Sequence, residues 1–339
     1  MKALTARDVA LRLTLLALLL LAALALGVCA GPGAPRGIAA LRELASPGGG
    51  PAEDIVLRVR LPRALLAAVV GAALASAGAL FQALLRNPLA DPYVLGVSGG
   101  AAVGGILALS FGPALGWGAA AVPPAAFAGA LVTTAILYAA AGVRGRVSAT
   151  HLLLTGVVFN AFASAGIVFM ASFAGLTEGT SLFLWLIGSL SAARADAAPV
   201  VAAFLALGLA CALPLLRDLN LLSLGEESAQ QLGVEVGRVQ RVLLLSTSLM
   251  VGAAVAVAGL VGFVGLIVPH LLRLRLGPDH RLLVPAAALG GAAFLVFCDT
   301  AARTWFGGRE LPVGAITALV GGPLFLYLLR RSQLRSFVP

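Results

Sequence analysis

The segment Gly96-Val-Ser98-Gly-Gly100 fits the G-x-S-x-G pattern of serine hydrolases, which makes Ser98 a candidate nucleophile. In those enzymes a strand precedes the serine and a helix follows it, whereas here the pattern opens an apolar segment. Two interpretations follow. One is an intramembrane serine hydrolase with His270 as the base. The other is a cluster of small residues that lets helices pack closely.

Metal and redox chemistry find little support in the sequence. The chain has three histidines and three cysteines, which are His151, His270, His280, Cys29, Cys211 and Cys298. No two histidines stand at i, i+4, no HExxH motif occurs and no CxxC pair is present. The pattern therefore indicates neither a metal site nor a disulfide framework. We expect this chain to bind no cofactor or metal of its own.

ATP binding by a P-loop requires a lysine within the loop, and this sequence has no lysine in such a motif. A P-loop has the form G-x-x-x-x-G-K-[ST], and the only lysine here is Lys2. ATP-driven transport would thus require a separate ATPase chain that carries the ATP and Mg²⁺. Asp299 is the one candidate for the proton relay of an ion-coupled secondary transporter. It also stands four residues before Arg303, the spacing of a helical ion pair.

These residues lie in a chain that is 60% hydrophobic and only 11% charged, against roughly 25% charged residues in soluble domains. The mean hydropathy of +1.03 indicates a protein that faces lipid. The net charge is +9, but the arginines are scattered rather than clustered on one segment. This distribution argues against nucleic-acid binding.

A stretch of about 20 apolar residues can cross a bilayer as a helix. Ten such segments predict an all-α, polytopic membrane protein with a single transmembrane domain, residues 1–339, and spans at 10–30, 62–85, 93–111, 119–141, 152–174, 196–215, 241–262, 264–276, 282–302 and 312–330. The first segment could also be a signal peptide, although no clean cleavage site follows it. Segment 264–276 is too short for a straight span and contains Pro269. Residues 31–61, rich in Gly and Pro, predict a loop with little regular structure.

The distribution of basic residues predicts the orientation of the spans. With the N-terminus in the cytoplasm, alternating spans put fifteen of the 23 basic residues inside and eight outside, as the positive-inside rule expects. Both termini are then cytoplasmic. Residues 70–78 (VGAALASAG) and 251–259 (VGAAVAVAG) share seven of nine positions on spans of opposite direction. This pattern is typical of a weak inverted repeat in transporters.

Several motifs occur in an order that resembles one transporter family. They are Arg60-Leu-Pro-Arg63, GALFQALLRNPLADP at 78–92, Leu95-Gly-Val-Ser98, LSLGEESAQQLG at 222–233, GFVGLIVPH at 262–270, ELPVG at 310–314 and GGPLF at 321–325. With these motifs the chain resembles the FecCD/BtuC-type permeases of ABC importers for iron-siderophores, heme and cobalamin. The resemblance implies a type II importer permease in the bacterial inner membrane. It also implies a homodimer, two cytoplasmic ATPase subunits and an external substrate-binding protein.

The resemblance assigns the contact with the ATPase to the segment between the sixth and seventh spans. Its residues are Leu224, Gly225, Glu226, Glu227, Ser228, Ala229, Gln230, Gln231, Leu232 and Gly233. The residue pattern itself predicts a short amphipathic helix there. Its polar face would contain the glutamates and glutamines, while Leu224, Ala229 and Leu232 can bury.

Two further sets of residues are implied by the resemblance. The cytoplasmic gate matches Asn87, Leu89, Ala149 and Thr150, where Ala149 is smaller and less polar than the hydroxyl residue of the cobalamin permease. The arginines that meet acidic residues of the binding protein match Arg60, Arg63 and Arg303. The alternative for these arginines is that they cap helices or bind lipid phosphate.

Overall fold

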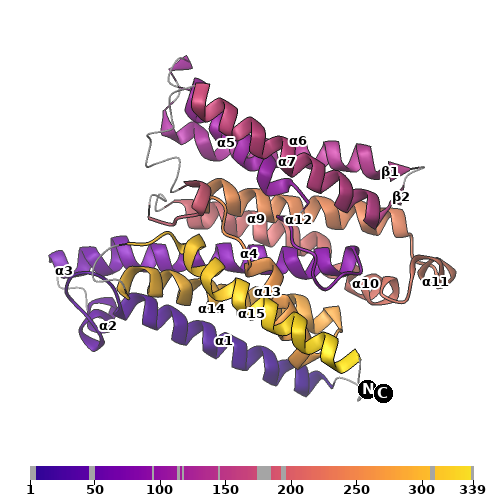
Figure 1. Cartoon of the computed structure of the whole chain (residues 1–339). Helices are drawn as coiled ribbons and strands as arrows, with labels where there is room; N and C mark the ends of the chain where they lie inside the picture. Colours follow the sequence, from indigo (N-terminus) through magenta and orange to yellow (C-terminus); the bar gives the residue numbers. More distant parts are fainter. Residues whose placement is uncertain are drawn as a thin grey trace.

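The computed structural model of the chain describes residues 5–45, 50–93, 95–112, 115–116, 118–143, 146–173, 185–191, 196–305 and 310–336. These residues form a bundle of helices with one short pair of strands (Figure 1). Helices α2 (Ile38–Ala45) and α3 (Pro51–Asp54) lie at one end of the bundle, here called the α2 end. Helix α11 (Glu226–Gln231) lies at the opposite end, here called the α11 end.

The long helices account for most of the bundle, and shorter elements connect them. The long helices are α1 (Ala6–Cys29), α4 (Leu61–Leu84), α5 (Val97–Phe111), α6 (Val122–Ala141), α7 (Ala149–Phe173), α9 (Ala197–Ala212), α12 (Val236–Ala258), α13 (Val264–Leu276), α14 (His280–Thr304) and α15 (Val313–Ser336). The shorter elements are the π-helical turn η1 (Ile55–Arg60), the 3₁₀ turns η3 (Ala119–Ala121) and η5 (Leu213–Leu215), helix α10 (Leu216–Leu222), and the antiparallel strands β1 (Gly142–Val143) and β2 (Arg146–Val147).

Each of the ten apolar segments predicted from the sequence coincides with one of these long helices. Within the described residues, seven helices are long and apolar enough to cross a membrane, and α5 and the Val313–Leu328 stretch of α15 are shorter apolar segments. Helix α13 has 13 residues. At 1.5 Å per residue it is about 20 Å long, less than the roughly 30 Å of a bilayer core. It continues through Pro269, and its length agrees with the prediction of a short segment.

The expectation of an irregular loop over residues 31–61 is wrong for most of its described part. Helix α2 occupies Ile38–Ala45, and α3, η1 and α4 run on from one another as a helical stretch over Pro51–Leu84. Pro51 stands in the first turn, where a proline costs no helical hydrogen bond, so the Gly- and Pro-rich sequence starts a helix here.

Helices α4, α12 and α14 form the interior, whereas α1, α7 and α9 expose most of their apolar side chains. Small residues bring the inner helices together. A Cβ atom at Gly71 of α4 would overlap the carbonyl group of Gly291 in α14, and one at Gly78 would overlap Gly265 in α13. Both glycines belong to the first repeated stretch. Gly252, in the second stretch, packs less tightly against α6, where an added Cβ atom would lie 3.0 Å from the Cβ of Ala130 and 3.2 Å from the ring of Phe127. Helices α4 and α12 run in opposite directions (Figure 1), as an inverted repeat requires.

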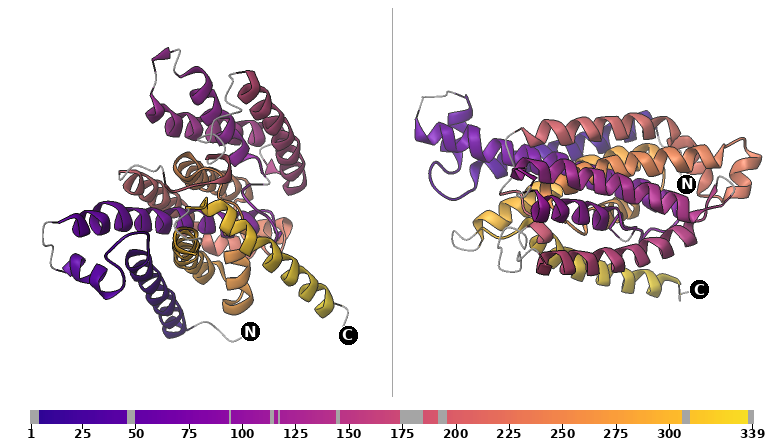
Figure 2. Two further views of the ribbon diagram at one scale, coloured as in Figure 1. Left: turned by 60° about the vertical axis from the view of Figure 1, so that its left-hand side comes forward. Right: turned by 90° about the horizontal axis from the view of Figure 1, so that it is seen from above.

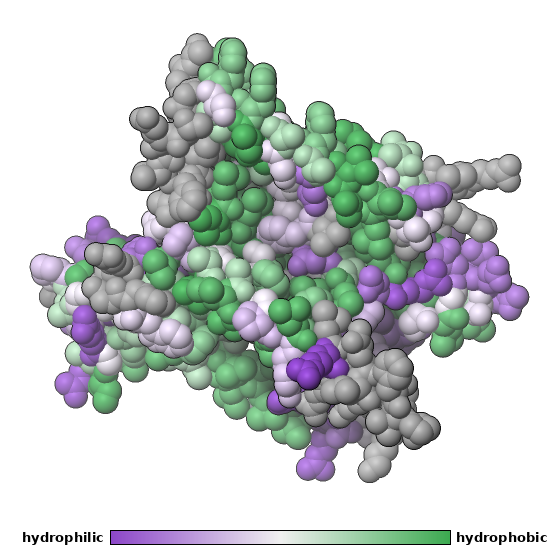
Figure 3. Space-filling view, in the orientation of Figure 1, coloured by the Kyte–Doolittle hydropathy of each residue, from purple (hydrophilic) through white to green (hydrophobic). Residues whose placement is uncertain are grey.

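The surface divides along the bundle in the way expected of a membrane protein. Hydrophobic surface covers α5, α6 and α7 and extends over α1, while polar surface gathers at the α2 end and at the α11 end (Figure 3). A protein that crosses a bilayer places apolar side chains against lipid and polar side chains at both faces. The two ends of the bundle are therefore where soluble partners can bind.

Candidate functional site

Helix α11 is set apart from its neighbours by two glycines. Gly225 (φ +116°) precedes the helix and Gly233 (φ +86°) follows it, and residues with a side chain rarely adopt these backbone angles. The chain can therefore leave α10, make one short helix and enter α12 within a few residues. Polar side chains cover the surface over α10 and α11 (Figure 3). The predicted short helix is present, with bounds Glu226–Gln231 inside the predicted 224–233.

The expected burial of the three apolar residues is correct for Ala229 only. Ala229 is completely buried, but Leu224 is 66% exposed and Leu232 is 59% exposed. The two leucines stand just before and just after α11, beyond the reach of the bundle. These two exposed leucines, on either side of one short polar helix, are the apolar side chains that a partner protein could bury at this end.

An ion pair connects α11 to the most deeply buried helix. Arg86 Nη2 lies 3.3 Å from Glu226 Oε1. Arg86 follows the end of α4 and has a positive φ of 50°. The Asn87 amide donates to the Gln82 carbonyl over 3.1 Å, which closes the end of α4. A displacement of α11 would therefore act directly on the end of α4.

A second connection joins α10 to the start of α14. Asn220 Nδ2 donates to Asp279 Oδ1 over 2.8 Å, and Asn220 Oδ1 accepts from the His280 amide over 2.9 Å and lies 2.7 Å from His280 Nδ1. Arg281 also donates to the Asp279 carboxylate. The hydrogen bonds that Asp279 accepts, above all from the Arg281 side chain and also from Asn220, hold the pKa of its carboxyl group well below the usual range. The segment that carries α11 is thus fastened to α14 as well as to α4.

The loop between α4 and α5 contains two of the predicted gate residues. Asn87 Oδ1 accepts from the Leu89 amide over 2.9 Å, and Asp91 Oδ1 accepts from the Tyr93 amide over 2.9 Å, so each side chain stabilises its own turn. Asn87 is half-buried and Leu89 is exposed. Asp91 is buried, which raises its pKa to about 6.

The other two gate residues lie at the start of α7. Thr150 is exposed, and the side chain of Ala149 lies outside the described residues. In the part of the chain that the structure describes, no hydrogen bond joins Asn87 or Leu89 to Thr150. The gate assignment therefore stays a prediction. A residue that sequence reasoning missed links the two segments: Asn160 of α7 donates its Nδ2 to the Tyr93 carbonyl over 2.7 Å. A single asparagine in an apolar span was the available signal.

At the α2 end, Arg60 points into the protein. Its side chain is 2% exposed. Its guanidinium group donates to the Val28 carbonyl in the last turn of α1 and to three carbonyl groups in the loop that follows, those of Pro32, Gly33 and Pro35. Arg60 therefore holds this loop in place. These contacts agree with the capping alternative, and the assignment of Arg60 to docking of the binding protein stays a prediction.

Arg63 and Arg303 share the carboxylate of Asp299. Arg63 Nη2 and Arg303 Nε each lie 3.0 Å from an Asp299 oxygen, and Arg63 Nη1 lies 3.0 Å from Glu310 Oε2. Asp299 and Arg303 are almost completely buried. The predicted pairing of Asp299 with Arg303 is confirmed, and Arg303, like Arg60, is turned inward. Docking of a partner at these arginines stays a prediction, and their side chains already have partners within the chain.

Ser98 and His270 are not arranged as the nucleophile and base of a serine hydrolase. Ser98 is 2% exposed in the first turn of α5, which begins after Gly96 at a φ of +88° rather than after a strand. His270 lies against the backbone of Pro88. Across the described ranges, no hydrogen bond joins Ser98 to His270, and no group of three His, Cys, Asp or Glu side chains could hold a metal ion. The small residues around Ser98 serve packing instead, since a Cβ atom at Gly100 would overlap Thr133 of α6.

Residues 15–331 match the sequence model of the FecCD transport family. The chain belongs to this family. It is 45% identical over 285 residues to the cobalamin import system permease protein BtuC of Halobacterium salinarum, a match that covers 84% of this chain and 76% of that protein. It is 44% identical over 292 residues to the hemin transport system permease protein HmuU of Yersinia pestis, covering 82% and 84% of the two chains.

A solved structure agrees with this assignment. It is described as an inward-facing conformation of an ABC transporter of the metal-chelate type, and it matches 95% of this chain and 99% of its own with a TM-score of 0.82 and 30% identity. The chain is thus the permease component of an ABC importer, and ATP hydrolysis belongs to a separate subunit. Neither the secondary transporter nor the serine hydrolase is supported.

Proposed function

We propose that the chain works as a homodimer that imports a metal chelate, with α11 and both termini on the cytoplasmic side. The observation that carries the proposal is the contact surface at the α11 end. Two exposed leucines flank a short helix, and Arg86 and Asn220 connect its segment to α4 and α14. An ATPase subunit that binds this surface would move both inner helices together.

The proposed orientation has two supports. Helix α1 begins and α15 ends at the same end of the bundle as α11 (Figure 1). The count of fifteen basic residues on the N-terminal side against eight on the other agrees with placing this end in the cytoplasm. The α2 end then faces the substrate-binding protein outside the membrane.

The proposed homodimer rests on an apolar face formed by α7 and α15, which lie on the same side of the bundle (Figure 2). Phe162 and Phe169 of α7 and Leu326 of α15 are each at least two-thirds exposed. Gly166 and Gly322 on the same helices have open space where a Cβ would stand. Small residues between large apolar ones let helices of two subunits approach closely in lipid. A second copy would bury this face and leave a path between the subunits.

The names of the relatives make cobalamin and heme the two leading candidate substrates. Permeases named for cobalamin or vitamin B12 are 40% to 45% identical to this chain, and the hemin permease is 44% identical. The two groups of permeases are similarly related to this chain, so both ligands enter the test below. Both are large metal chelates, and a ferric siderophore is a third member of the same class.

The proposal is tested by uptake into proteoliposomes that contain the permease, its ATPase and its binding protein. Labelled cobalamin, heme and a ferric siderophore are supplied separately. We expect uptake of one ligand only when all components and ATP are present, and a permease mass of two copies in the complex. Uptake by the permease alone under an ion gradient would contradict the proposal. A complex with a single permease copy would contradict the homodimer.

A further inference from the structure

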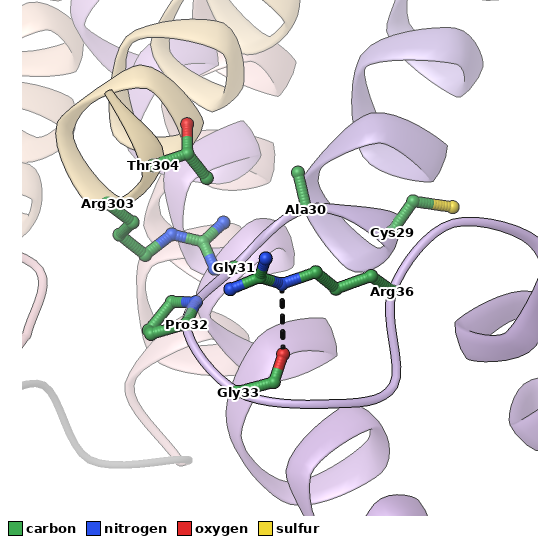
Figure 4. A pocket seen from close by; sticks show the side chains of 8 residues that line it. All are labelled: Cys29, Ala30, Gly31, Pro32, Gly33, Arg36, Arg303 and Thr304. Atoms are coloured by element: carbon green, nitrogen blue, oxygen red, sulfur yellow. Dashed lines mark hydrogen bonds between the residues drawn. The ribbon is translucent and has the colours of Figure 1, made fainter. Parts of the chain in front are cut away.

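A pocket of about 660 Å³ opens at the α2 end, between the loop that follows α1 and the last turn of α14 (Figure 4). Its wall includes Cys29, Gly31, Arg36, Arg303 and Thr304. It lies apart from the α11 surface, at the other end of the bundle (Figure 1). Neither the coupling segment nor the α7 and α15 face contributes to it.

The side chains of Arg36 and Arg303 approach the pocket from opposite walls. Figure 4 shows their guanidinium groups directed toward one another across Gly31. Arg36 uses its Nε to donate to the Gly33 carbonyl over 3.2 Å. Arg303 uses Nε toward Asp299 and Nη2 toward the Gly27 carbonyl. Within the described residues, the Arg303 Nη1 and both Arg36 terminal nitrogens have no protein acceptor.

The surroundings of the pocket carry an excess of positive charge. Arg60 Nε lies 2.8 Å and Arg303 Nη1 3.5 Å from the position that a Cβ atom of Gly31 would occupy. Arg60 is close enough to Arg36 and to Arg303 for the charges to repel. The two nearby carboxylates, Asp299 and Glu310, are already shared by Arg63 and Arg303. An anion between the free donors would relieve this repulsion.

The depth of the pocket indicates where such an anion comes from. Helix α1 has 24 residues and is about 36 Å long, so Cys29 at its end stands at the edge of a bilayer core of about 30 Å. The helix exposes its leucines along its whole length. Trp305, next to the pocket residue Thr304, is 65% exposed and packs edge-on against Phe297. Tryptophan collects at the level of lipid headgroups.

We propose that this pocket binds the phosphate group of an anionic phospholipid, between Arg36 and Arg303. The planar guanidinium group offers paired donors that match two phosphate oxygens. The acyl chains would lie along α1, and the headgroup would fasten the loop of residues 30–37 against α14. The lipid would thereby hold α1 in place at the substrate side of the importer.

The test compares lipid retention by the full-length permease and two variants. Arg36→Ala removes one wall of the pocket, and because Arg36 is exposed the fold does not depend on it. Arg58→Ala is the matched control, since Arg58 is exposed at the same end and pairs with Asp54. Native mass spectrometry then measures binding of phosphatidylglycerol and of phosphatidylcholine. We expect Arg36→Ala to weaken phosphatidylglycerol binding about tenfold, and Arg58→Ala to leave it unchanged.

A second measurement uses the thiol in the pocket wall. In a Cys211→Ser background Cys29 is the accessible cysteine, because Cys298 is buried. We expect a maleimide to label Cys29 several times more slowly in nanodiscs of phosphatidylglycerol than of phosphatidylcholine, and Arg36→Ala to abolish the difference. Equal labelling in both lipids would overturn the proposal. So would displacement of the lipid by millimolar inorganic phosphate, or an Arg36→Ala defect confined to affinity for the binding protein.

Discussion

Arg86, just past the end of α4, lies 3.3 Å from Glu226, the first residue of α11. One partner directly follows the most buried helix of the bundle, and the other belongs to a surface helix that the family resemblance assigns to the ATPase. The pair is partly exposed, so its contribution to stability is small, of the order of 1 kcal/mol or less. The ion pair instead fixes the position of α11 relative to the end of α4.

Glu226→Ala should therefore reduce transport without reducing stability. We expect ATP-dependent uptake to fall several-fold while the melting temperature stays within about 2 °C of wild type. Glu227→Ala, one residue further along the same helix, is the control and should keep its uptake. Exchange of the two charges in Arg86→Glu with Glu226→Arg should restore part of the loss. A double variant no better than Glu226→Ala would show that the ion pair has no role in coupling.

The exposed leucines that flank α11 provide a second test. Leu224→Asp and Leu232→Asp place a charge on the proposed contact surface but remove no packing from the bundle, because both side chains are exposed. We expect the amount of ATPase that co-purifies with the permease to fall at least about tenfold. Leu274→Asp, a change at an exposed leucine of α13, is the matched control. Normal ATPase binding by both flanking variants would exclude this surface.

The close contact of α4 with α14 predicts a change in stability. Gly71→Ala introduces a methyl group that overlaps the carbonyl of Gly291, and the helices must separate to admit it. We expect a loss of about 1–3 kcal/mol, measured as a lower midpoint in thermal or denaturant unfolding in detergent. Gly262→Ala should be neutral, since nothing lies within 4 Å of its added Cβ.

Much of the helical framework was accessible from hydrophobic runs alone, because each span of apolar residues can satisfy its backbone only as a helix in lipid. The exposure of Leu224 and Leu232 could not be predicted from the sequence in this way. The amphipathic spacing predicts which side chains share a face of the helix. Whether that face is buried depends on where α11 lies, and it lies beyond the bundle. The same holds for Arg60, whose four acceptors are carbonyl groups at the end of α1 and in the loop after it, 25 to 32 residues earlier in the chain. No spacing rule connects those groups.

The buried carboxyl group of Asp91 predicts a pH dependence. Its pKa in the folded protein, about 6, lies above the ordinary value of 3.8. Folding therefore favours the protonated, neutral form of Asp91. The resulting contribution to the free energy of unfolding is fully present below about pH 4 and is lost as the pH rises through 6. Asp91→Asn keeps an oxygen that can accept from the Tyr93 amide. We expect it to raise stability at pH 7 by up to about 3 kcal/mol, and to flatten the change in melting temperature between pH 4 and pH 7. An unchanged slope in the variant would contradict the assignment.

Asp299→Asn distinguishes the structural role of this residue from a proton relay. Its carboxylate contacts both Arg63 and Arg303, and Arg303 is almost completely buried. Neutralising the acid leaves the Arg303 guanidinium group without a charged partner. Loss of one partner of a buried ion pair costs about 3–5 kcal/mol, so we expect a large drop in the melting temperature. The fraction that stays folded should still transport with ATP. Asp54→Asn, which breaks an exposed pair with Arg58 at the same end, should leave stability within about 1 kcal/mol of wild type. A fully stable Asp299→Asn protein whose uptake no longer responds to a proton gradient would instead identify Asp299 as a relay.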